Sequence, residues 1–319
     1  MPFFDYPLSQ LTTYRSSATA PADFDAFWER TLAETRAHPL DARFTKVETG
    51  LSVFDVYDVS FAGFGGHRVR GWYITPAGQS PERCVVKFIG YGGGRDLPQQ
   101  HLLWPSTGRA VLVMDTRGQG SSWSVSETPD PVGSDPAHPG VMTRGILDPD
   151  AYYYRRVFTD GVRAVEAART RPGVDPDKIV VCGGSQGGGI AVAVAGLDPR
   201  LAGLMPDVPF LCDFPRAVGL TTRDPYCEVV RYLVAQRSHA ERAFHTLNYF
   251  DGVHFAARTK SAALYSVGLM DDTCPPSTVY AAYNAHVGPK QIEIYTFNNH
   301  EGGGSLQEKR QIAWLAQQG

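Results

Sequence analysis

The chain has 319 residues, of which 43% are hydrophobic and 20% are charged, and its formal net charge is −3. This composition is typical of a globular protein and excludes extended disorder, and the absence of a basic run removes the usual signal for a nucleic-acid partner. No stretch approaches the roughly 18 consecutive apolar residues of a membrane span, and the opening residues lack the basic-then-apolar pattern of a signal peptide, so we expect a cytoplasmic protein without a membrane partner.

One helix is predicted in the N-terminal extension, which covers about residues 1–50. Acidic residues occupy the first turns of Ala22–His38, where they complement the positive end of a helix. The apolar residues of this segment recur at helical spacing, at Phe24, Phe27, Trp28 and Leu32.

Strands and helices then alternate to the end of the chain. Short apolar or alternating runs predict strands at Phe54–Phe61, Arg68–Thr75, Cys84–Gly90, Ala110–Asp115, Lys178–Gly183, Leu201–Pro206, Ala262–Gly268 and Gln291–Phe297. The matching helices are Ala151–Arg169, Gly187–Gly196, Pro276–His286 and Leu306–Gln317. Such alternation predicts an α/β fold with a mostly parallel sheet flanked by helices.

A long segment interrupts this alternation late in the chain. Residues 209–258 are rich in aromatic side chains and too numerous for a simple connection. We therefore expect a helical insertion before the strand Ala262–Gly268, within a single domain that covers residues 1–319.

The strongest chemical signal is the sequence Gly-Gly-Ser-Gln-Gly at 183–187, which has an apolar strand before it and a small-residue helix after it. A Gly-x-Ser-x-Gly motif in this context is typical of the nucleophile elbow of the α/β-hydrolase fold. There the serine sits on a sharp turn and small residues on both sides avoid a clash. The sequence thus predicts that Ser185 is a nucleophile.

His300 is the candidate general base, because it follows the last predicted strand and precedes the last helix. The candidate acid is Asp271, which follows the strand Ala262–Gly268 and gives the chain order Ser…Asp…His of α/β-hydrolases. Spacing alone leaves the adjacent Asp272 open as an alternative, and we favour Asp271.

The oxyanion hole of such an enzyme needs two backbone amides. One is expected at Gln186, directly after the nucleophile. The other is expected at Tyr91, in the glycine-rich segment 90–94 that follows the third predicted strand and can approach a substrate closely.

Neither a metal nor a cofactor is expected. The five cysteines contain no Cys-x-x-Cys pair, which argues against a zinc site and against a disulfide framework, and the sequence His-Glu-x-x-His does not occur.

Several separated motifs resemble those of one family. They are Arg-Gly-Gln at 117–119, Gly-Gly-Ser-Gln-Gly at 183–187 and His-Glu at 300–301, together with segments 1–5, 152–156 and 207–214. Over essentially its whole length, the chain resembles the acetyl xylan esterases and cephalosporin C deacetylases of carbohydrate esterase family seven.

This resemblance implies hydrolysis of acetyl esters of short xylo-oligosaccharides and of cephalosporin C, as well as perhydrolysis of acetyl esters with peroxide. It also implies a homo-hexamer whose active sites face an internal cavity. By motif position, Tyr91, Phe210 and Pro225 should border a small acyl pocket. From the residue alone, we interpret Arg117 as structural, because a guanidinium with many donors can tie loops beneath a site.

Three alternative functions compete with this one. A serine peptidase of the prolyl-oligopeptidase type shares this fold but usually carries a large extra domain, for which 319 residues leave no room. A general short-chain carboxylesterase would share the whole triad. A non-catalytic binding protein on the same scaffold usually lacks a triad member, and all three are present here.

Overall fold

The computed structural model describes residues 3–133, 135 and 137–318, so Met1 and Pro2 of the family-like opening lie outside the described residues. The strands are β1 (Arg43–Val47), β2 (Phe54–Ala62), β3 (Arg68–Pro76), β4 (Cys84–Phe88), β5 (Ala110–Met114), β6 (Ile179–Gly184), β7 (Gly203–Asp207), β8 (Ala262–Gly268) and β9 (Lys290–Tyr295). The helices are α1 (Leu8–Leu11), α2 (Phe24–Arg36), α3 (Tyr153–Arg169), α4 (Gln186–Leu197), α5 (Phe214–Leu220), α6 (Tyr226–Ala235), α7 (Ala240–Asn248), α8 (Gly252–Ala256), α9 (Pro276–Ala285) and α10 (Gly304–Gln317). Short 3₁₀ turns lie at Phe64–Gly66, Pro98–His101, Pro105–Thr107 and Arg237–His239.

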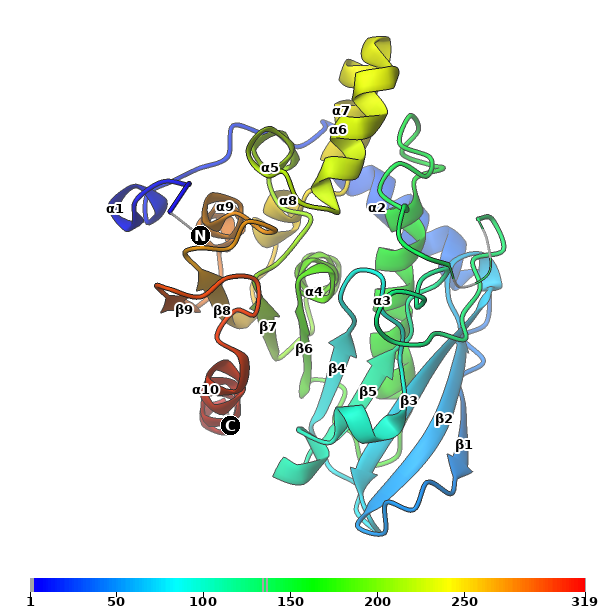
Figure 1. Ribbon diagram of the computed structural model, residues 1–319. Coiled ribbons are helices and arrows are strands. Elements are labelled where there is room, and N and C mark those ends of the chain that lie inside the picture. The colour runs from blue at the N-terminus through cyan, green and yellow to red at the C-terminus, as the bar shows by residue number, and fades with distance from the viewer. Residues whose placement is uncertain (1–2, 134, 136, 319) are drawn as a thin grey trace.

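All of these strands form one nine-stranded sheet in the order β1-β2-β3-β5-β4-β6-β7-β8-β9 (Figure 1). The pairs from β5 to β9 are parallel, whereas β1, β2, β3 and β5 pair antiparallel. This is the mostly parallel sheet of the α/β-hydrolase fold, and the predicted fold class is confirmed. The carboxyl ends of the parallel strands meet at one edge of the sheet, where ligand sites of such folds form.

Side chains from successive residues of the central strands enter two different cores, as the pleat of a strand requires. Val180 of β6 packs in a core with Trp314 of α10, whereas Val181 packs in a larger core with Phe158 of α3 and Ile190 of α4. Figure 1 accordingly shows α10 (red) apart from α3 and α4. Because both faces are covered, β4, β5 and β6 are almost continuously apolar, which is why their sequence runs were recognisable.

The predicted insertion is helical: α5, α6, α7 and α8 all lie between β7 and β8. A buried carboxylate ties two parts of it together. Asp251 accepts hydrogen bonds from the backbone amides of Asp213 (2.8 Å), Phe214 (2.9 Å) and Val253 (3.0 Å), and burial raises its pKa to about 7.

Two elements of the N-terminal extension were not predicted. The edge strand β1 carries mostly exposed side chains, so it lacks the apolar pattern that identifies a buried strand. The helix α1 has a single turn, which is too short for a periodic signal. No helix in the described part of the chain is long and apolar enough to cross a membrane.

Candidate active site

Ser185 occupies the turn between β6 and α4, with φ of 55° and ψ of −120°. A non-glycine residue in this region is strained, and such strain is typical of a nucleophile elbow. The turn is tight enough to require glycines nearby. A Cβ at Gly183 would lie 2.5 Å from the backbone of Gly187, and one at Gly187 would lie 2.3 Å from the carbonyl oxygen of Phe88.

The three predicted triad residues form one chain of hydrogen bonds. His300 Nε2 lies 2.9 Å from Ser185 Oγ, and His300 Nδ1 lies 2.9 Å from Asp271 Oδ2. Since an ionised carboxylate can only accept, Nδ1 carries the ring proton and Nε2 is free to accept the serine hydroxyl proton. This tautomer is the one that a general base requires.

The adjacent carboxylates have different surroundings. Asp271 is fully buried, and its Oδ1 accepts the backbone amides of Thr273 (2.8 Å) and Cys274 (2.9 Å). The Asp272 carboxylate instead pairs with Arg223 Nε at 2.9 Å, away from the imidazole. The structure thus brings Asp271, and not Asp272, to His300.

Both segments expected to supply oxyanion donors lie beside Ser185. Gln186 is the first residue of α4, and Tyr91 lies in the loop after β4 that lines a cavity together with Ser185. Within the described part of the chain, neither the Gln186 amide nor the Tyr91 amide donates to a protein acceptor. Two free amides next to a nucleophile can stabilise a developing oxyanion.

Sequence reasoning missed a buried side-chain network that joins these two segments. Gln119 Oε1 accepts the amide of Gly92 (2.7 Å), and Gln119 Nε2 donates to Gln186 Oε1 (2.8 Å). Tyr154 also donates to Gln186 Oε1 (2.8 Å), and Gln186 Nε2 donates to the carbonyl of Ile89 (3.1 Å). The Arg-Gly-Gln motif contained the signal, since it places a glutamine in the loop that follows the strand β5.

We expect Gln119→Met to lower the free energy of unfolding by about 1–3 kcal/mol, because it leaves the buried Gly92 amide without an acceptor. The variant should also lower kcat roughly ten- to a hundredfold, because the two amide-bearing segments lose their link. Urea denaturation and acetyl ester hydrolysis measure the two effects. Gln79→Met, at an exposed position, is the matched control, and equal stability of the two variants would contradict this role.

The ring of Tyr91 is held from its hydroxyl end. The hydroxyl donates to Glu228 Oε1 of α6 (2.7 Å) and accepts the amides of Gly140 (3.0 Å) and Val141 (2.9 Å). Burial raises the pKa of both the Tyr91 hydroxyl and the Glu228 carboxyl, and the neighbouring carboxylate raises that of the tyrosine further. The tyrosine therefore stays neutral and can donate this bond.

Two cavities meet at Ser185 and His300. The first, of about 520 Å³, is lined by Tyr91, Pro139 and Pro225, and the second, of about 700 Å³, is lined by Lys87, His101 and Glu308. Of the three residues expected at the acyl pocket, Tyr91 and Pro225 line the first cavity. Phe210 is fully buried and lies one layer behind, with its ring centroid 6.3 Å from that of Tyr91.

Arg117 is structural, as interpreted from the sequence. Its buried guanidinium forms two hydrogen bonds to Asp160 of α3, at 2.5 and 2.7 Å, and its carbonyl accepts the Tyr153 hydroxyl. The arginine thereby fixes the loop after β5, which carries Gln119, onto α3.

In the described chain, one cluster of metal-ligating side chains is found, and it overlaps the triad. Ligand atoms of Asp271, Cys274 and His300 lie within 4.8 Å of one another. Two of these residues already belong to the hydrogen-bond chain from Ser185, which uses both ring nitrogens of His300 and Oδ2 of Asp271.

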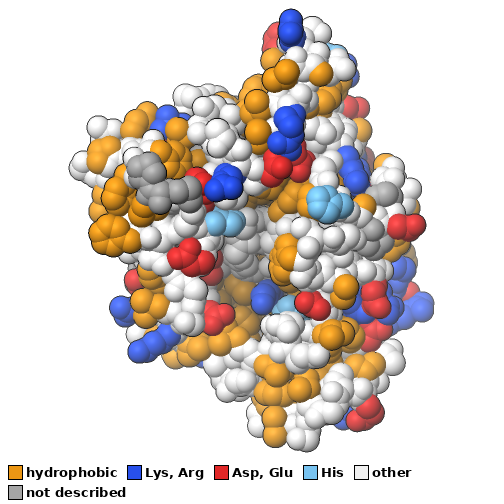
Figure 2. All heavy atoms as spheres, viewed as in Figure 1, with side chains coloured by type: hydrophobic (Ala, Val, Ile, Leu, Met, Phe, Trp, Pro, Cys, Tyr) orange, Lys and Arg blue, Asp and Glu red, His pale blue; other side chains and the backbone are white. Residues whose placement is uncertain are grey.

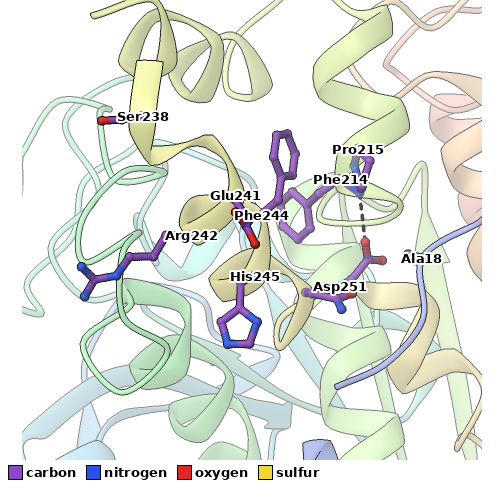
Figure 3. A pocket seen from close by; sticks show the side chains of 10 residues that line it. Ala18, Phe214, Pro215, Ser238, Glu241, Arg242, Phe244, His245 and Asp251 are labelled. Carbon is purple, nitrogen blue, oxygen red and sulfur yellow. Dashed lines mark hydrogen bonds between the residues drawn. The ribbon is translucent and has the colours of Figure 1, made fainter. Parts of the chain in front are cut away.

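The surface around this region is hollowed. Figure 2 shows a recess near the middle of the face seen in Figure 1, with histidine side chains (pale blue) at its rim. A further cavity of about 530 Å³ lies elsewhere, between α5, α7 and the N-terminal extension, and Figure 3 shows Phe214, Phe244 and His245 around it. None of the predicted site residues lines this cavity.

The fold, the strained Ser185 and its two partners define an α/β-hydrolase. Comparison with known proteins gives the family. The family model described as acetyl xylan esterase (AXE1) matches residues 1–318, so the chain belongs to the acetyl xylan esterase family. It is therefore an acetyl esterase, a carboxylic ester hydrolase.

Individual relatives agree with the family. The chain is 40% identical to an acetyl xylan esterase from Paenibacillus sp. R4, with a TM-score of 0.91 over 98% of this chain and 99% of that one. It is 33% identical to acetyl xylan esterase 1 from Thermoanaerobacterium sp. JW/SL YS485, with a TM-score of 0.88 over the same shares of the chains. It is also 28% identical over 306 residues to the acetyl esterase Axe7A of Xylanibacter ruminicola, covering 93% of this chain and 67% of that protein.

For the peptidase alternative, the comparisons show a shared fold and nothing more. An acylaminoacyl peptidase from Pyrococcus horikoshii is 15% identical, with a TM-score of 0.59 over 83% of this chain and 41% of the peptidase.

Proposed function

We propose that this acetyl esterase works through a Ser185–His300–Asp271 triad and an acetyl-enzyme intermediate. The observation that carries the proposal is the unbroken hydrogen-bond chain through the three side chains. Labelling with a fluorophosphonate tests it directly, since the reagent should modify Ser185 and no other residue.

In the first half of the reaction, Ser185 Oγ attacks the acetyl carbonyl carbon while His300 Nε2 takes the hydroxyl proton. The tetrahedral intermediate collapses, and the alcohol leaves with the proton that His300 returns to it. In the second half, His300 activates a water that attacks the acetyl-serine, releases acetate and restores the hydroxyl. Throughout, Asp271 holds the imidazole tautomer and stabilises the imidazolium.

The negative charge of each tetrahedral intermediate would be bound by the amides of Gln186 and Tyr91. Each such donor is worth roughly 3 kcal/mol of transition-state stabilisation. Neither amide donates a hydrogen bond to another group in the described part of the chain, and this supports the assignment.

For the substrates, we infer acetylated short xylo-oligosaccharides and cephalosporin C. The family match and the names of the two acetyl xylan esterases support the sugar esters. Rates on acetylated xylose, acetylated xylan and cephalosporin C would rank these substrates. The proposed homo-hexamer is tested separately by light scattering after size-exclusion chromatography.

We expect kcat/KM to fall as the acyl chain of the ester grows. Tyr91 and Pro225 place bulky groups in the lining of the first cavity, and one extra methylene at a pocket that fits an acetyl group is worth about ten- to two-hundredfold in discrimination. The measurement is kcat/KM for p-nitrophenyl acetate, propionate, butyrate and octanoate.

A maximum at butyrate or longer would refute the small acyl pocket and favour a general carboxylesterase. A peak at acetate that broadens in Phe210→Ala would place the steric limit at that ring, which supports Tyr91 from behind. Activity on an aminoacyl-proline anilide above that on the acetate ester would favour the peptidase alternative.

A further inference from the structure

The two cavities beside Ser185 differ in chemistry. They share Gly90, Trp123, Ser185 and His300, so an ester bound at the nucleophile would extend into both. The first cavity is lined largely by the apolar groups of Tyr91, Trp123, Pro139 and Pro225, with Asp224 as its one carboxylate among the lining residues. The second is lined by many polar or charged side chains, among them Lys87, Asp96, Gln100, His101, Glu301 and Glu308.

Trp123 stands where the two cavities join, and 62% of its surface is exposed. The side chain is nevertheless anchored, because its indole Nε1 donates to the carbonyl of Tyr91 at 2.8 Å. The ring also lies directly against Gly93, where a Cβ would approach Trp123 Cζ2 to 2.2 Å. Glycine at this position therefore makes room for the indole.

Tryptophan is enriched at binding surfaces, where its N–H group has a partner in the protein and its ring offers a large apolar surface to a ligand. Its flat surface suits the axial C–H groups of a pyranose ring, while the sugar hydroxyls need polar partners around it. The second cavity offers such partners. Neither the Gln100 amide nor the Glu308 carboxylate forms a hydrogen bond with another described side chain.

The charge of this cavity favours a neutral ligand. The carboxyl groups of Asp96, Asp207, Glu301 and Glu308 line it and outnumber the ammonium group of Lys87, so they oppose an anionic alcohol group. His101 is buried, and burial lowers its pKa to about 4, so it is uncharged at neutral pH and adds no positive charge to balance them.

We propose that Trp123 is the stacking platform for the sugar ring of the substrate, and that the second cavity binds the alcohol side of the ester. This inference rests on the proposed function, since it assumes that Ser185 attacks the acetyl group between the two cavities. It assigns the apolar first cavity to the acyl group and makes Trp123 a determinant of specificity for carbohydrate acetates.

The test compares two acetyl esters that differ only in the alcohol, acetylated xylose and ethyl acetate, by titration of the acetic acid released. We expect Trp123→Ala to lower kcat/KM roughly tenfold more for acetylated xylose than for ethyl acetate, because loss of the bond to the Tyr91 carbonyl affects both esters and loss of the ring affects only the sugar ester. Trp123→Phe keeps a ring but loses the N–H donor, and it should retain most of the preference for the sugar ester. Phe297→Ala, which removes an aromatic side chain that is 80% exposed and lines neither cavity, is the matched control.

An equal loss on both esters in Trp123→Ala would overturn the proposal, because it would mean that the indole acts only by holding the Tyr91 carbonyl. An unchanged rate on acetylated xylose would overturn it as well. Binding of xylobiose, measured by calorimetry, separates this inference from the proposed function. If the wild-type protein hydrolysed neither ester, the proposed function would be wrong. Weaker binding of xylobiose by Trp123→Ala than by wild type would even then support the stacking role of Trp123. Equal binding by the two proteins would refute that role.

Discussion

Ser185→Ala is expected to lower kcat for acetyl ester hydrolysis by on the order of a million-fold, the scale found when a triad nucleophile is removed. His300→Ala should cost about as much. The double variant should be scarcely slower than either single variant, because the serine is a nucleophile only while the imidazole 2.9 Å away accepts its proton. Initial rates at saturating p-nitrophenyl acetate measure all three effects.

Ser122→Ala is the matched control, since it removes a hydroxyl from the same cavity that contains Ser185. It should leave kcat nearly unchanged. A strictly additive double variant would show that Ser185 and His300 do not act as a unit, and a Ser185→Ala variant with near-normal rates would exclude this serine as nucleophile.

Much of this site was predictable because the positions of its residues depend on local backbone geometry, which leaves a pattern in the sequence. The turn at Ser185 can form only where small residues surround it, so the glycines at 183 and 187 predict a nucleophile elbow. The predicted strands around it were recognisable because both faces of the sheet are covered. His300 and Asp271 then followed from their places after strands, since the carboxyl ends of parallel strands meet at one edge.

Other features depend on contacts between segments that are distant in sequence, and no local pattern predicts those. Gln119 reaches Gln186 across 67 residues, and Tyr91 reaches Glu228 across 137. The resemblance placed Phe210 at the acyl pocket by motif position, but only the packing shows that Phe210 is fully buried against Tyr91 and does not line the cavity itself. In the same way, the exposure of Trp123 cannot be read from its neighbours in the chain.

The choice between two adjacent carboxylates shows how such contacts decide function. Chain order allowed both Asp271 and Asp272, because residues one apart differ only in the direction of their side chains. In the structure, the buried Asp271 lies at the imidazole, while Asp272 turns to Arg223 at the surface. The two carboxylates should therefore respond very differently to the same substitution.

Asp271→Asn is expected to lower kcat by on the order of ten-thousand-fold, because the new amide would donate to His300 Nδ1 and hold the imidazole in the wrong tautomer. The variant should still fold, since an amide oxygen can accept the backbone amides of Thr273 and Cys274. Asp272→Asn is the matched control and should change kcat by less than about threefold, because it weakens one partly exposed ion pair. Steady-state rates on p-nitrophenyl acetate, with thermal unfolding to verify both folds, measure the difference. The opposite ranking would assign the acid to Asp272, and equal small losses would mean that neither carboxylate orients the base.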